Sequence, residues 1–75
     1  MSYSRWTKGN NWYAFYSTEE CLALWHSNGN YIDWLPEELQ GIDAADIMEK
    51  YECSKDDARE AIKYIEMFLE DVKNN

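Results

Sequence analysis

Few residues of this chain could carry out covalent chemistry. Cys21 could act as a nucleophile, with His26, five positions later, as its general base. A β-strand would direct these two side chains to opposite faces, and no third residue is indicated that would orient the histidine. We therefore predict that the protein is not an enzyme.

The acidic residues do not show the spacing of a metal or acid–base site. His26 is the only histidine, which excludes a site built from several histidines, and the acids lack the alternating spacing of a calcium loop. The adjacent pairs Glu37-Glu38 and Glu70-Asp71 are expected on exposed helix surface, where a catalytic pKa is not favoured. We expect no catalytic residue, no metal and no cofactor.

The charge is strongly negative and unevenly distributed. The chain has 15 acidic and 7 basic residues and a net charge of −8, and twelve of the acids but only five of the bases follow Pro36. Binding to a phosphate backbone requires clustered Lys and Arg, so direct nucleic-acid binding is not expected. The charge predicts instead that the partner is a basic surface of another protein, including proteins that handle DNA or RNA.

Nothing in the sequence predicts a membrane or a secreted protein. No stretch approaches the roughly 20 apolar residues that span a bilayer, and no basic-then-apolar leader opens the chain. Cys21 and Cys53 have apolar neighbours and are interpreted as small buried hydrophobic residues, although a single disulfide between them stays open. We expect a cytoplasmic protein.

The 75 residues are expected to form one domain, residues 1–75, near the lower size limit for folding without disulfides or metals. Residues 1–35 form an aromatic, β-rich half and residues 36–75 an acidic, helical half. A buried aromatic ring removes roughly 150–250 Å² from water. We therefore predict that the ten Trp and Tyr residues belong to the core, including the four tryptophans, all of which precede Pro36: Trp6, Trp12, Trp25 and Trp34.

Residues 11–17 are predicted to form a β-strand, because aromatic residues dominate the segment. Its alternation places Trp12, Ala14 and Tyr16 on one face and Tyr13 and Phe15 on the other. Since both faces are apolar, we expect each of them to be covered.

Residues 18–28 allow two interpretations. Ser17, followed by an acid three residues later, fits a capping box, so residues 21–26 could form a helix that ends at Asn28-Gly29. Asn-Gly between two apolar segments is also a strong hairpin signal. We favour the hairpin, with its second strand at residues 31–34, and hence an antiparallel meander.

Three helical segments are predicted after the sheet. Residues 36–39 form a short turn that begins with proline and ends before Gly41. Asp43 caps a helix to about Glu52, and Ser54 caps the last helix, with Asp57 placed to complete a capping box. The inner side of the middle helix is expected to carry Ala44, Ile47, Met48 and Tyr51. The fold class is therefore α+β, with about three strands packed against two to three C-terminal helices.

The last helix is the clearest pattern. Its apolar residues recur at three- and four-residue steps: Ala58, Ala61, Ile62, Ile65, Phe68, Leu69 and Val72. Acids dominate the opposite arc, and solvation alone can explain them. Met67 falls within this arc, where a flexible thioether suits a partner contact. We predict a partner-binding face with these residues: Asp56, Asp57, Glu60, Tyr64, Glu66, Met67, Glu70 and Asp71.

Residues 47–62 resemble a helix–turn–helix unit, particularly that of GntR-type winged-helix repressors. The matching positions are Ser54, Arg59, Ala61 and Ile62. Residues 42–65 also resemble the helical part of small antitoxin-like proteins, through Tyr51, Asp57, Ala61 and Tyr64. Glu52 replaces the usual turn glycine, however, and Asp56 and Asp57 stand where polar or basic side chains would face DNA. The resemblance implies an antitoxin or transcriptional regulator as the alternative function.

The N-terminal half is similar to small uncharacterised phage and mobile-element proteins that open with Ser-Arg-Trp and Trp-Tyr-x-Phe, here residues 4–6 and 12–15. We predict a small acidic protein-binding module. Its most concrete form is a phage- or mobile-element-encoded inhibitor that occupies the nucleic-acid channel of a host protein, analogous in size and charge to anti-CRISPR and DNA-mimic proteins. An edge strand could pair with its twin, so a homodimer stays open.

Overall fold

A computed structural model of the protein describes residues 4–74. Four strands form one antiparallel sheet: β1 Ser4–Lys8, β2 Trp12–Ser17, β3 Leu22–His26 and β4 Tyr31–Trp34. Their order in the sheet is the order in the chain, which confirms the predicted meander but with one strand more than the expected three. Strand β1 was not predicted because its inward positions, Arg5 and Thr7, are polar and give no apolar alternation.

The ambiguous segment after Ser17 is a hairpin, as favoured. Strands β3 and β4 pair through Trp25↔Tyr31 and Leu22↔Trp34. The loop between them closes with the Gly29 N–H donating to the His26 carbonyl at 3.0 Å, and Gly29 has a φ of 98°. This left-handed conformation costs glycine little and occurs both in hairpin turns and at helix ends. The pairing of β3 with β4 shows that it belongs to a hairpin turn here.

Three helices follow: α1 Pro36–Leu39, α2 Ala44–Tyr51 and α3 Lys55–Asn74. The predicted caps are present, since the Asp43 carboxylate accepts the Asp46 N–H at 3.0 Å and the Ser54 hydroxyl accepts the Asp57 N–H at 3.1 Å. The α2 helix ends at Tyr51, and the residue that caps it, Glu52, has a φ of 53°. The turn between α2 and α3 therefore needs the left-handed conformation that a glycine would adopt most easily.

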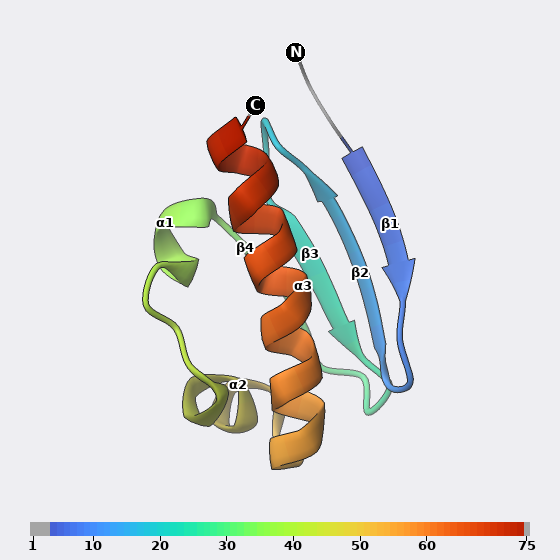
Figure 1. Ribbon diagram of the computed structural model, residues 1–75. Coiled ribbons are helices and arrows are strands. Elements are labelled where there is room, and N and C mark those ends of the chain that lie inside the picture. The colour runs from blue at the N-terminus through green and yellow to red at the C-terminus, as the bar shows by residue number, and fades with distance from the viewer. Residues whose placement is uncertain (1–3, 75) are drawn as a thin grey trace.

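The elements form two layers, with the sheet on one side and the helices on the other (Figure 1). The long helix α3 runs across the sheet and contacts β2, while α1 and α2 pack beside it. The inner face of the sheet and the inner stripe of α3 enclose the core. Its buried apolar residues are Trp12, Ala14, Tyr16, Leu22, Leu24, Trp34, Leu39, Ile47, Tyr51, Ala58, Ala61, Ile65 and Phe68.

Tyr51 is the polar centre of this core. Its ring is fully buried, and its hydroxyl accepts the indole N–H of Trp34 at 2.9 Å and donates to the Leu24 carbonyl at 2.9 Å. Side chains of the β3–β4 loop complete the arrangement, because the amides of Asn28 and Asn30 each donate to the Tyr51 carbonyl at 2.8 Å. The end of α2 is thus capped from the sheet.

The expectation that all four tryptophans are core residues is wrong for two of them. Trp12 and Trp34 are buried, but Trp6 is 59% and Trp25 39% exposed. Both exposed rings lie on the outer face of the sheet, which no helix among residues 4–74 covers. The prediction that both faces of β2 are covered is wrong for the same reason, because the helices pack on only one side.

Met48, expected on the inner side of α2, is 36% exposed, whereas Ile47 and Tyr51 are buried and Ala44 packs against the core as expected. Within residues 4–74, no helix combines the length and the apolar character that crossing a membrane requires.

Candidate functional site

The eight residues of the predicted partner-binding face do not share one solvent-exposed surface. Helix α3 is wide enough to contact the sheet with its apolar stripe and with the polar positions on either side of that stripe. Three of the predicted acids are therefore half-buried and bonded to the sheet half of the protein: Asp57, Glu60 and Asp71. For these three, the expectation of a wholly solvated acidic arc is corrected.

Asp57 holds the start of α3 against the sheet. Its carboxylate lies 2.8 Å from Nε2 of the buried His26 and accepts the side-chain amide of Asn11 at 3.1 Å. Because His26 Nδ1 accepts the Asn28 N–H at 3.0 Å, the ring proton is placed on Nε2, which donates to Asp57. The hydrogen bonds from His26 and Asn11 hold the pKa of Asp57 below its usual value. The role of this acid is structural.

Glu60 binds the turn between β1 and β2. Its carboxylate accepts the Asn10 N–H at 3.1 Å and also the hydroxyl of Tyr64. The turn approaches so closely that a methyl group added at Gly9 would lie 1.8 Å from Glu60 Oε2. Burial and the bond to Glu60 raise the pKa of Tyr64, so its hydroxyl stays protonated and donates.

Asp71, near the C-terminal end of α3, also binds the sheet. It accepts the hydroxyl of the buried Tyr16 and lies 3.7 Å from Nε of Arg5. Burial and the bond to Asp71 raise the pKa of Tyr16 to about 12. Arg5 therefore compensates an acid of α3, whereas the other base of β1, Lys8, has its Nζ 5.4 Å from the centre of the Tyr13 ring.

The other predicted residues lie farther from the sheet. Asp56, Glu66 and Glu70 are exposed, whereas Tyr64 and Met67 are half-buried at the border of the sheet contact. Met67 was expected to stand free within the charged arc, and its half-burial corrects that expectation. The exposed part of the predicted face is thus reduced to three carboxylates.

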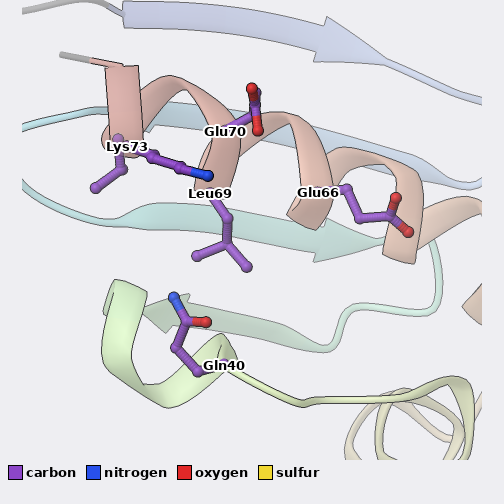
Figure 2. Close-up of a pocket in the computed structure, with 6 residues that line it drawn as sticks. Gln40, Glu66, Leu69, Glu70 and Lys73 are labelled. Atoms are coloured by element: carbon purple, nitrogen blue, oxygen red, sulfur yellow. The ribbon is translucent and has the colours of Figure 1, made fainter.

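Two of these carboxylates border a groove between α1 and α3. The groove has a volume of about 450 Å³ and is lined by Gln40, Glu66, Leu69, Glu70, Val72 and Lys73. Figure 2 shows Leu69 pointing from α3 toward α1, where Gln40 faces it, while Glu66 and Glu70 project from other sides of α3. We call this feature the acidic groove. Its apolar side chains are Leu69 and Val72, and the carboxylates of Glu66 and Glu70 and the ammonium of Lys73 lie beside them.

Of the two acids at positions where the resembling repressors would face DNA, Asp56 is exposed and Asp57 is half-buried. In the resembling repressors, the first turn of the second helix carries side chains toward the groove of the duplex. Here that turn is the start of α3, and the Asp57 side chain is bonded to His26 and Asn11 of the sheet half. The α2–α3 hairpin packs as part of the core.

Cys21 and His26, the candidate nucleophile and base, each contact a different carboxylate and not one another. His26 is bound to Asp57 on the helix side of the sheet, whereas the Cys21 thiol lies 3.9 Å from the Asp33 carboxylate. Cys21 and Cys53 are both free and half-buried, and burial raises the pKa of each thiol, which keeps it protonated at neutral pH.

The sequence did not reveal the second surface of interest, the outer face of the sheet. Its exposed large rings are Trp6, Tyr13, Phe15, Trp25 and Tyr31, and we call this surface the aromatic face. A shallow pocket of about 370 Å³ opens there between Trp6, Tyr13 and Trp25. The signal was present in β2, since alternation separates Tyr13 and Phe15 from the buried set. Aromatic content alone favours the core for all of these rings, however, and does not show which face of a sheet the helices leave open.

Within residues 4–74, no group of three or more His, Cys, Asp or Glu side chains is arranged to hold a metal ion. Comparison of the chain with models of known families, with curated proteins and with solved structures finds no match.

Proposed function

We propose that the protein is a small non-enzymatic binding module that docks its acidic helical layer on a basic surface of another protein. The helical half exposes nine acidic side chains and five basic ones. Such an excess attracts a basic partner over a distance of about a Debye length and orients it toward the helices.

The acidic groove is the observation that carries this proposal. A lysine or arginine has an apolar stem and a charged end. Leu69 and Val72 can contact the stem while Glu66 and Glu70 attract the charge. Gln40, across the groove on the α1 side, adds a hydrogen-bonding group. With two carboxylates against the one ammonium group of Lys73, the groove carries a net negative charge and suits basic side chains better than neutral ones.

In its most concrete form, the module is an inhibitor encoded by a phage or mobile element. It would occupy the nucleic-acid channel of a host protein, with carboxylates in place of phosphates. Channels of this kind are lined by Lys and Arg because they follow a phosphate backbone. The support is the small size of the chain, its net charge of −8 and the groove described above.

The test is a charge reversal at the groove. Wild-type protein and the variant Glu66→Lys/Glu70→Lys are immobilised and exposed to a host lysate at low salt, and the captured basic protein is then purified and titrated. We expect the reversed variant to bind at least about tenfold more weakly, because two attractions become repulsions at the centre of the contact. Binding of the wild type should weaken as salt is raised.

The matched control is Glu19→Lys/Glu20→Lys, which makes the same change of net charge at exposed positions in the turn between β2 and β3, outside the helical layer. We expect it to bind within about threefold of the wild type. Equal binding by all three proteins would refute the role of the groove. For the inhibitor form, single- or double-stranded nucleic acid must compete with the module for the captured protein, and a lack of competition would exclude that form.

A further inference from the structure

The aromatic face is continuous across all four strands. Register places Lys8, Tyr13, Trp25 and Tyr31 in one row, and Trp6, Phe15, Ala23 and Asp33 in the next. The rings contact one another: the centres of Trp25 and Tyr31 are 4.2 Å apart in a stacked pair, and those of Trp6 and Tyr13 are 5.6 Å apart. These contacts order the rings before any partner arrives.

The exposed area of this surface is large for so small a domain. The five rings are 39–59% exposed. For aromatic side chains that present about 150–250 Å² each, this leaves roughly 450 Å² of exposed ring surface. The largest apolar patch of a typical monomer is about 300–600 Å² and often marks an interaction site. Two such faces brought together would bury roughly 900 Å² of aromatic surface, close to the ~1,000 Å² of a specific interface.

The charge of the aromatic face differs from that of the helices. Among the outward-facing strand residues, Lys8 and Asp33 are the charged ones, so the face is neutral within a chain whose net charge is −8. A basic partner is attracted to the helical layer rather than to this side. For a second copy of the chain the charge favours this side, because repulsion is smallest when the two neutral faces meet and both acidic layers point away from each other.

We propose that the aromatic face binds a second copy of this chain, forming a two-fold symmetric dimer in which the two sheets pack face to face. This proposal does not depend on the acidic groove, which stays exposed on the outside of each copy. Sheets packed in this way lie about 10 Å apart with their strands nearly aligned, so their side chains interdigitate.

A two-fold axis parallel to the strands gives matching contacts on both copies. It places β1 of one copy over β4 of the other and β2 over β3. Phe15 then lies over Ala23 of the second copy, so a large side chain meets the smallest one on the face. Lys8 lies over Tyr31 and next to Asp33 of the second copy, a cation above a ring and beside a carboxylate.

Sedimentation equilibrium from about 5 µM to about 1 mM protein tests this proposal. An interface near the low end of the specific range predicts a dissociation constant in the micromolar range. Association should strengthen between about 50 mM and about 500 mM salt, since salt screens the repulsion between two acidic chains. The proposed basic partner would show the opposite salt dependence, so failure of one proposal is distinguishable from failure of the other.

Two variants locate the contact. Phe15→Glu changes an exposed position, so the monomer should stay folded by circular dichroism, while the dimer dissociation constant rises at least about 30-fold. Met48→Glu makes the same kind of change on α2, outside the aromatic face, and should leave the dimer intact. Dimer formation would remove Trp6 and Trp25 from water. Tryptophan emission should therefore shift to shorter wavelength with rising protein concentration in the wild type and in Met48→Glu, but not in Phe15→Glu.

Exchanging the large and the small side chain at positions 15 and 23 tests whether Phe15 lies over Ala23 of the second copy. Phe15→Ala and Ala23→Phe should each weaken the dimer, and the double variant should recover most of the association, because large again faces small in both contacts. A protein that is monomeric at about 1 mM and high salt would overturn the proposal. So would a dimer that is unaffected by Phe15→Glu, which would place the contact on an edge strand, or a double variant weaker than either single one.

Discussion

Glu60 on α3 accepts the backbone N–H of Asn10 at 3.1 Å, although the two residues lie fifty positions apart in the chain. The β1–β2 turn is thereby attached to the helix, and Asp57 extends the attachment to Asn11. Two carboxylates that look like free surface charge in the sequence hold a sheet turn and a helix together.

This attachment leaves no room for a side chain at Gly9. A methyl group there would lie 1.8 Å from Glu60 Oε2 and 1.9 Å from the Tyr64 hydroxyl. Both groups are the ends of flexible side chains and can shift, so we expect Gly9→Ala to lower the free energy of unfolding by about 1 kcal/mol, the worth of the displaced hydrogen bonds of Glu60. Urea denaturation followed by fluorescence measures the change.

The matched control for Gly9→Ala removes the Glu60 carboxylate that the added methyl group would contact. In a Glu60→Ala background, Gly9→Ala should cost clearly less than in the wild type, because one of the two clashing groups is gone. An equal cost in both backgrounds would mean that the close approach to Glu60 is not the reason for glycine at this position.

The contact between Asp57 and His26 predicts how the free energy of unfolding changes at low pH. The pKa of Asp57 is lower in the folded protein than its usual 3.8. Its contribution to stability is therefore complete above that usual value and is lost as the pH falls through the lower folded value. Unfolding free energies measured between about pH 7 and pH 2.5 should decrease in this range, and Asp57→Asn should show less of the decrease.

Asp56→Asn is the control for this experiment. Asp56 neighbours Asp57 in the first turn of α3 but is exposed. We expect Asp56→Asn to retain the acid dependence of the wild type. If Asp57→Asn retained it as well, the contacts of Asp57 with His26 and Asn11 would not contribute to the acid sensitivity.

Much of the fold could be predicted because local signals and tertiary structure agree. Pro36, Gly41, Asp43 and Ser54 mark the helix ends, and the structure places α1, α2 and α3 where they indicate. The β3–β4 hairpin follows from Asn28-Gly29 in the same way. Strand β1 could not be predicted, because its inward side chains are polar and its pairing depends on β2.

The candidate surface was harder to predict, because periodicity shows which side of a helix is polar but not how far a sheet extends beneath it. Asp57, Glu60 and Asp71 fit the polar arc of α3, yet the width of the sheet brings them into contact with Asn11, Asn10 and Tyr16. Similarly, aromatic content alone does not distinguish buried Trp12 from exposed Trp25. That distinction depends on which face the helices cover.

Glu52 lies in a conformation that disfavours it. Its φ of 53° at the end of α2 is left-handed, where a side chain is strained and glycine is not. We expect Glu52→Gly to raise the free energy of unfolding by about 0.5–1 kcal/mol. Glu52→Ala is the control, because it removes the same charge and keeps the strain. A gain of equal size in both variants would point to the charge instead of the backbone.

Tyr51 is expected to matter through its hydroxyl as well as its ring. Tyr51→Phe keeps the buried ring but leaves the Trp34 indole N–H without its acceptor in the core. An unsatisfied buried donor costs about 1–3 kcal/mol, so the free energy of unfolding should fall by that amount. Tyr13→Phe removes a hydroxyl from an exposed ring and should change stability by less than about 0.5 kcal/mol. Equal stabilities of the two variants would show that the link from Trp34 through Tyr51 to Leu24 adds nothing to the ring packing.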